Sequence, residues 1–173
     1  MNLDLSGQIA LVTGASRGIG QAIADELVKC GAKVIGTATS EDGAKAINAR
    51  LEATGGRGAV LNVTDPKACE DIIDLIVKDF GGISILVNNA GITRDNLFMR
   101  MSDDEWQSVI DVNLTSTFRL CRAVLRGMMK ARWGRIVNIS SIVGATGNPG
   151  QGNYAASKAG MIGMRSEEHT SEL

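Results

Sequence analysis

The sequence predicts a doubly wound α/β domain, in which helices cover both faces of a parallel sheet. Short apolar runs alternate with helical segments along the chain. These runs are nearly continuous, which is typical of strands buried on both faces. The chain has 21 glycines against two prolines, and the glycines gather where strands are expected to end, so they indicate tight turns and close backbone approaches.

Four strands and three helices are expected in the first half of the chain. The strands are Ile9 to Val12, Lys33 to Thr37, Ala59 to Val63 and Ile83 to Val87. The helices begin near Ile19, at Glu41 and at Pro66, and end before Cys30-Gly31, at Ala53 and at Phe80. Asp65 serves the third helix as N-cap, followed by a first-turn proline.

The second half is expected to hold a long helix, a fifth strand and a further helix. Ser102 and Glu105 have the spacing of a capping box, and the helix that they begin is expected to continue to about Lys130. The fifth strand runs from Arg135 to Ser140, and a glycine-rich stretch from Gly144 to Gly152 precedes the last helix. The segment from Arg165 to Leu173 is polar and lacks the apolar periodicity of that helix.

Composition argues against several classes of partner and site. A chain of 173 residues is suited to one domain, and a net charge of −1 provides no basic field for nucleic acid or an anionic membrane. Asp4 stands where a signal peptide would be basic, and no apolar run has membrane-spanning length, so we expect a cytoplasmic protein. The three cysteines lie far apart and predict neither a disulfide framework nor a metal site.

Tyr154 and Lys158 are four residues apart on a predicted helix, with Ser141 upstream where a strand should end. Residues at this spacing share a helix face, so the phenol and the ammonium would point into one cleft. A nearby cation favours phenolate over phenol, which makes tyrosine a usable general acid in carbonyl chemistry. Taken alone, the same spacing is also that of an ordinary surface contact.

The segment from Thr13 to Gly20 predicts a dinucleotide site. Its glycines lie between the first strand and the first helix, where backbone N–H groups and the helix N-terminus can approach a pyrophosphate. A glycine-rich turn can be only a turn, but the strand before it and the helix after it favour binding.

The second strand predicts NADP rather than NAD, because no acid in Gly36 to Ser40 is available to a ribose 2′-OH. Arg17 could instead meet a 2′-phosphate, and Thr39 could donate its hydroxyl or belong to the start of the next helix. Asn62-Val63 and Asn89-Ala90-Gly91 follow strands three and four, at the edge where cofactors lie, although both could be ordinary turns.

The glycine turn, Asn88 to Gly91, Asn113, Ser141 and the Tyr154/Lys158 pair, in this order and spacing, resemble the short-chain dehydrogenase/reductase family. Within that family, the segments 36–40 and 91–97 are similar to bacterial 3-oxoacyl-[acyl-carrier-protein] reductases of fatty acid synthesis. The resemblance runs from about Asp4 to Met164. It implies a Rossmann-like fold, NADPH as cofactor, a 3-oxoacyl group on acyl carrier protein as substrate, and a homotetramer.

The resemblance also implies roles for individual residues. Tyr154 would protonate the carbonyl oxygen, Ser141 would hydrogen-bond it, and Lys158 would hold the nicotinamide ribose. Asn113 would connect Lys158 to a water relay, and Arg132 would help to dock the acidic carrier protein. The predicted cofactor-binding residues are Gly14, Ser16, Arg17, Gly18, Ile19, Gly20, Thr39, Asn62, Val63, Asn89, Ala90, Gly91, Tyr154 and Lys158.

Two alternatives remain at this point. One is a short-chain reductase of acyl-CoA or of another small carbonyl compound, and the other is a nucleotide-binding module without catalysis. Members of the family normally continue well beyond Lys158, and the segment 165–173 resembles a translated sequencing adapter. We therefore expect a truncated domain over 1–164, a foreign tail over 165–173 that contains His169, and poor activity from the 173-residue chain alone.

Overall fold

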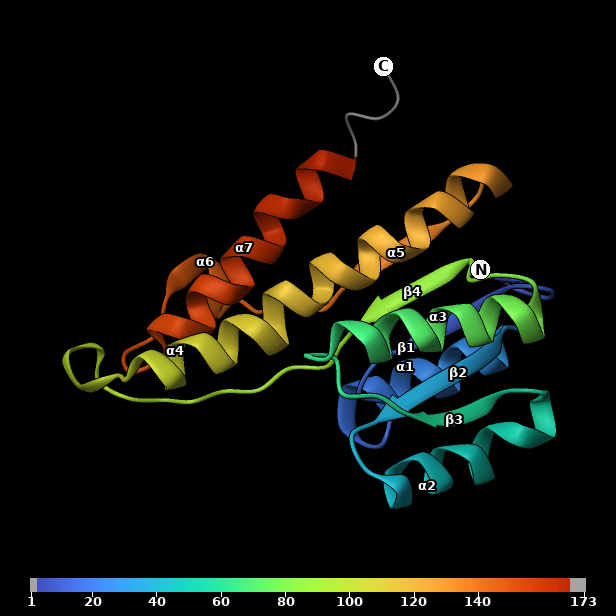
Figure 1. Cartoon of the computed structure of the whole chain (residues 1–173), viewed down its shortest axis with the longest axis horizontal. Helices are drawn as coiled ribbons and strands as arrows, with labels where there is room; N and C mark the ends of the chain where they lie inside the picture. Colours follow the sequence, from blue (N-terminus) through green and yellow to red (C-terminus); the bar gives the residue numbers. More distant parts are fainter. Residues whose placement is uncertain (1–2, 169–173) are drawn as a thin grey trace. The chain divides into compact units, whose positions relative to one another are not determined.

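The computed structural model describes residues 3–168 and contains a five-stranded sheet in the order β3-β2-β1-β4-β5. The strands β1 to β4 are labelled in Figure 1. The strands are β1 Ile9–Val12, β2 Lys33–Ala38, β3 Arg57–Val60, β4 Ile85–Asn88 and β5 Arg135–Asn138. β1 pairs in parallel with β2 and with β4, and β2 pairs in parallel with β3. Ala10 of β1 lies opposite Val34 on one side and Ile85 on the other. The predicted doubly wound fold is confirmed.

The described helices follow the strands in the sequence, with at least one helix after each strand. They are α1 Gly18–Lys29, α2 Glu41–Leu51, α3 Pro66–Phe80, α4 Asp103–Ile110, α5 Ser116–Ala131, α6 Val143–Thr146 and α7 Gly152–Glu168. Two 3₁₀ turns are present, η1 Glu52–Thr54 and η2 Phe98–Arg100, and η3 Asp111–Thr115 is a π-helical turn between α4 and α5. No helix within 3–168 has the length and apolar character needed to cross a membrane.

The chain divides into two compact units. The first contains the residues up to 90 together with 119–137, and the second contains 91–118 and the described residues from 138 onward. The first unit holds the sheet and a core formed by buried residues of β1, β4 and the flanking helices, including Leu11, Leu86, Ile47 and Ile76. In the second unit, α7 packs against both α4 and α6.

The sheet order creates a reversal beside β1. The chain leaves β1 for β2 and β3 on one side, and later returns through α3 to β4 on the other side. Ligands of such sheets bind outside the carboxyl ends of the strands where the order reverses. The turns that follow β1 and β4, at Thr13-Gly14 and Asn89-Ala90, lie at this position.

The two helix N-caps predicted from the sequence, at Asp65 and Ser102, are confirmed. Asp65 accepts hydrogen bonds from the backbone N–H groups of Lys67 and Ala68, and Ser102 and Glu105 form the predicted capping box.

Several predicted boundaries were wrong. The third strand covers Arg57–Val60 rather than Ala59 to Val63, because Asn62 Oδ1 accepts hydrogen bonds from Thr64 and turns the chain. The long helix predicted up to Lys130 is interrupted by η3, and the glycine-rich stretch overlaps a short helix, α6. The boundary expected between a domain over 1–164 and a foreign tail over 165–173 stays a prediction: α7 is described as far as Glu168, and residues 169–173, including His169, lie outside the described residues.

Candidate active site

Helix α7 places Tyr154 and Lys158 on one face. The Lys158 ammonium lies 5.6 Å from the centroid of the Tyr154 ring. Tyr154 is half-buried, whereas Lys158 is only 4% exposed. The helical spacing therefore brings together a phenol and a cation, as the sequence predicted.

The Lys158 ammonium is held by the residues around it. Its Nζ donates a hydrogen bond of 2.7 Å to the Ile139 carbonyl and lies 3.7 Å from Met161 Sδ. Burial lowers the pKa of Lys158 from its ordinary value, because desolvation penalises the charged form. The Ile139 carbonyl and the face of the Tyr154 ring stabilise that charged form.

The segment after β5 packs tightly on α7. Ser140 Oγ donates to the Lys158 carbonyl at 3.1 Å. A Cβ at Gly144 would lie 2.8 Å from the carbonyl carbon of Lys158, so only glycine fits there without a shift. Ser141 Oγ accepts a hydrogen bond of 3.2 Å from the Val143 N–H, which leaves its own hydroxyl proton for another acceptor. The two adjacent serines therefore have different surroundings, and Ser140 is engaged with the helix backbone.

Asn113 is fully buried in the π-helical turn η3, a type of helix irregularity frequent at functional sites. Its Oδ1 accepts from the Ile92 N–H at 2.8 Å, and its Nδ2 donates to the Ile92 carbonyl at 3.0 Å. The same Nδ2 donates to Ser157 Oγ at 3.1 Å, and Ser157 Oγ donates to the Tyr154 carbonyl at 2.8 Å. Asn113 thus reaches α7 through Ser157, the residue before Lys158, and its expected connection to Lys158 through a water relay stays a prediction.

Sequence reasoning missed the structural role of Asn153. This side chain is fully buried, and its Nδ2 donates to the carbonyls of Arg94 and Glu105 at 2.9 and 3.2 Å. Its Oδ1 accepts from the Tyr154 N–H at 2.7 Å. Asn153 therefore fixes the start of α7 beside Tyr154. The available signal was an amide and a hydroxyl, Asn153 and Ser157, on the buried face of a helix that already carried the tyrosine and the lysine.

In the first unit, the turn after β1 is joined to the turn after β4. Asn89 Nδ2 donates to the carbonyls of Thr13 and Gly14 at 2.9 and 3.1 Å. Thr13 Oγ1 accepts from the N–H groups of Asn89 and Ala90, each at 3.0 Å. A Cβ at Gly20 would lie 2.3 Å from the Gly14 carbonyl oxygen, so α1 can begin this close to the turn only with glycine there.

The N-terminus of α1 is open to an anion. Arg17 occupies its N-cap position with an extended backbone and makes no side-chain cap bond, whereas α2, α3 and α4 are capped by Ser40, Asp65 and Ser102. Gly18 has a φ of +58° and faces open space. The first-turn N–H groups of α1 therefore suit a pyrophosphate.

The remaining predicted cofactor residues lie near the carboxyl ends of the strands. Ser16, Arg17 and Ile19 are exposed around the start of α1, and Thr39 is exposed directly after β2. Asn62 is exposed after β3, whereas Val63 is buried. Gly91 begins the second unit, which also contains the four predicted catalytic residues.

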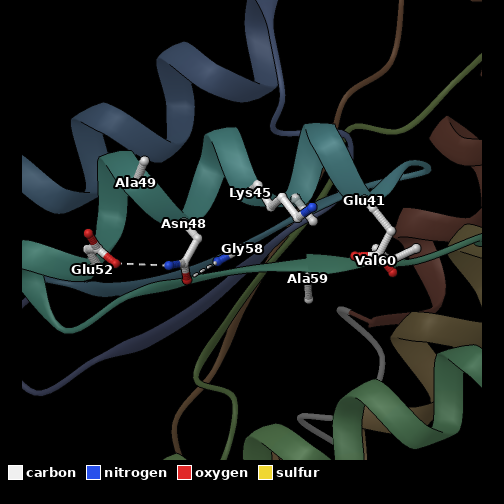
Figure 2. A pocket seen from close by; sticks show the side chains of 9 residues that line it. Glu41, Lys45, Asn48, Ala49, Glu52, Gly58, Ala59 and Val60 are labelled. Atoms are coloured by element: carbon white, nitrogen blue, oxygen red, sulfur yellow. Dashed lines mark hydrogen bonds between the residues drawn. The ribbon is translucent and has the colours of Figure 1, made fainter.

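A hollow of about 470 Å³ lies along α2 and β3. Figure 2 shows Asn48 at its centre, where the amide Nδ2 donates to Glu52 at 3.0 Å and Oδ1 accepts from the Gly58 N–H at 3.3 Å. None of the predicted site residues lines this hollow, and its central amide is engaged by its neighbours. The hollow is therefore separate from the candidate active site in its lining residues.

Comparisons with known proteins agree on one family. Residues 8–171 match the family described as short chain dehydrogenase. The chain is 63% identical over 162 residues to 3-oxoacyl-[acyl-carrier-protein] reductase FabG of Salmonella typhimurium strain LT2, and 62% identical over 162 residues to that of Escherichia coli strain K12. Each alignment covers 94% of this chain and 66% of the relative, so the chain spans slightly less than two thirds of their length.

A solved structure gives the same family. The crystal structure attributed to a short-chain alcohol dehydrogenase from Sinorhizobium meliloti 1021 matches with a TM-score of 0.87 and 39% identity. The match covers 95% of this chain and 66% of that chain.

Proposed function

The chain belongs to the short-chain dehydrogenase family, and on this basis we propose that its parent protein is an NADPH-dependent reductase of 3-oxoacyl groups bound to acyl carrier protein. The observation that carries the proposal is the buried Lys158 ammonium beside the Tyr154 ring on α7. The names of relatives about 60% identical to the chain support this choice of substrate.

The proposed reaction adds a hydride and a proton across a ketone. When bound, NADPH would supply the hydride that adds to the carbonyl carbon. Tyr154 gives its phenol proton to the carbonyl oxygen as negative charge develops there, and the Lys158 cation stabilises the phenolate that remains. Ser141 donates its hydroxyl hydrogen to the same oxygen and holds the carbonyl in place.

Residues of the first unit fit the proposed cofactor. The uncapped N–H groups at the start of α1 suit the pyrophosphate, which both nicotinamide dinucleotides contain. Arg17 and Thr39 are exposed beside that turn and after β2, where they can meet a 2′-phosphate.

Several basic residues at and after the end of α5 support an acidic carrier protein as partner. Arg132 has a φ of +51°, a left-handed conformation that usually favours glycine at this position. Lys130 and Arg135 are also exposed, and the Arg135 guanidinium lies 5.2 Å from the centroid of the Trp133 ring. A cluster of this kind can steer an acidic protein toward its site.

The proposal includes a homotetramer for the complete protein. Met129 on α5 is 72% exposed and Leu125 is 36% exposed, and association would cover such apolar surface.

The test compares thioester carriers. The chain, continued to the length of its relatives, is assayed for NADPH oxidation with a 3-oxoacyl group on acyl carrier protein and on CoA. We expect faster turnover on the carrier protein, and a selective loss of that advantage in Arg132→Ala. Preference for CoA or for a small ketone would reassign the substrate, and NADPH binding without turnover would favour a nucleotide-binding module.

A further inference from the structure

Arg50, near the end of α2, reaches the backbone of the glycine-rich turn. Its Nη2 donates a hydrogen bond of 3.2 Å to the carbonyl of Ala15. Its Nη1 lies 3.5 Å from Asp25 Oδ1 on α1, which is within the range of an ion pair but long for a hydrogen bond. The only well-placed acceptor of this guanidinium among the described residues is therefore the turn itself.

The turn is fixed by a series of bonds to its carbonyl groups. Asn89 donates hydrogen bonds to the carbonyls of Thr13 and Gly14, and Arg50 donates one to the next carbonyl, that of Ala15. Ala15 is fully buried, and its own N–H donates to the Thr37 carbonyl of β2 at 2.8 Å. The bond from Arg50 is thus the last of these restraints before the exposed residues begin at Ser16.

The geometry of the peptide bond extends this restraint to Ser16. In a trans peptide the C=O of one residue and the N–H of the next lie in one plane and point in opposite directions. Holding the Ala15 carbonyl toward Arg50 therefore directs the Ser16 N–H away from Arg50. It also keeps a carbonyl dipole from turning toward a bound anion.

We infer that Arg50 is a positioning residue for the dinucleotide, which orients the Ala15–Ser16 peptide so that the Ser16 N–H faces the pyrophosphate. The inference rests on the proposed function, because it assumes that this turn binds the cofactor. Arg50 acts through the backbone of the turn and not through the 2′-phosphate. Its loss should therefore lower the affinities for NADPH and NADH alike. Arg17, in contrast, is proposed to meet the 2′-phosphate that only NADPH carries.

A purely structural role is the alternative, since arginine in the last turn of a helix is favourable in any protein. Arg57 provides a matched control in the same unit. Its Nη2 pairs with Asp79 at 2.6 Å, and its guanidinium lies 5.2 Å from the centroid of the Phe80 ring, but it has no bond to the turn. Both arginines are partly exposed, with side chains 29% and 36% accessible.

The experiment compares Arg50→Met with Arg57→Met in the chain continued to the length of its relatives. Methionine keeps most of the apolar stem and removes the guanidinium. NADPH and NADH affinities are measured by fluorescence titration, and amide hydrogen exchange of the segment 13–20 is measured without nucleotide. Arg50→Met should weaken both nucleotides by about three- to tenfold, the equivalent of one hydrogen bond, and should speed exchange in the segment. Arg57→Met should lower stability and leave both readouts unchanged.

Other outcomes separate the two proposals. Unchanged affinities and unchanged exchange in Arg50→Met would overturn the inference and leave the proposed function intact. A loss for NADPH alone would also overturn it, because it would place Arg50 at the 2′-phosphate. If the wild-type chain bound neither nucleotide, the proposed function would fail, and faster exchange in Arg50→Met would still support the control of the turn by Arg50.

Discussion

Lys158 Nζ donates a 2.7 Å hydrogen bond to the carbonyl of Ile139, so the buried ammonium links α7 to the residue that follows β5. In the same segment, Ser140 Oγ donates a hydrogen bond to the Lys158 carbonyl. The lysine is thereby held at both its backbone and its side chain, with its charge beside the Tyr154 ring.

Lys158 should make stability depend on pH in the alkaline range. Its folded pKa is lowered by burial, while the unfolded chain has a lysine pKa of about 10.4. Below the folded pKa, Lys158 is charged in both the folded and the unfolded state, and burial of its ammonium lowers the free energy of unfolding by its full amount. As the pH rises from the folded pKa to the unfolded value, the unfolded state holds more protons, so the wild type gains stability.

Lys158→Met should remove this contribution. Urea unfolding of both proteins is measured from neutral pH to above the unfolded lysine pKa. The stability of the wild type relative to the variant should rise with pH over that window. A difference between them that stayed constant across the window would contradict the burial of a charged Lys158.

Tyr154→Phe should remove most of kcat, because general acid catalysis contributes about 10²–10⁴-fold. The ring over the Lys158 ammonium is kept, so NADPH affinity should barely change. Initial rates of NADPH oxidation and a nucleotide titration separate the two effects. Near-normal turnover of the phenylalanine variant would show that another group donates the proton.

Arg17→Ala should discriminate between the two nucleotides. Loss of a hydrogen bond to the charged 2′-phosphate should weaken NADPH binding by about 1.5–3 kcal/mol, and NADH binding should change little. Calorimetric titration of both nucleotides measures the difference. Equal losses would rule out Arg17 as the residue that selects NADPH.

Asn113→Ala should destabilise the protein by about 1–3 kcal/mol, because the Ile92 N–H and carbonyl would lose their buried partner. Gln107→Ala is the control, since Gln107 lies on the same helical stretch and bonds Asp111 at the surface. That change should stay within about 0.5 kcal/mol of the wild type. Denaturant unfolding that gave both variants the same free energy would refute the anchoring role of Asn113.

Sequence reasoning was accurate where the signal was local. The caps at Asp65 and Ser102 depend on residues within one turn, and the order of strands and helices follows from short apolar runs and glycine stops. The i and i+4 spacing of Tyr154 and Lys158 likewise requires only a helix.

Features that depend on distant partners could not be predicted. Asn113 occupies a π-helical turn and bonds Ile92, which lies 21 residues earlier in the chain. The apolar residues of 59–63 suggested a longer strand, but the Asn62 side chain bends the backbone after β3. Asn153 could not be given a role because its partners, the carbonyls of Arg94 and Glu105, come from two other segments.

The most direct test of the proposed reaction follows the transferred hydrogen. The chain, continued to the length of its relatives, is incubated with a 3-oxoacyl group on acyl carrier protein and with NADPH deuterated at the reactive position of its nicotinamide. Mass spectrometry should find deuterium on the carbinol carbon of a 3-hydroxyacyl product, and only trace product from Tyr154→Phe. A 3-hydroxyacyl product without deuterium, or no product while NADPH is bound, would contradict hydride transfer at a site built on Tyr154 and Lys158.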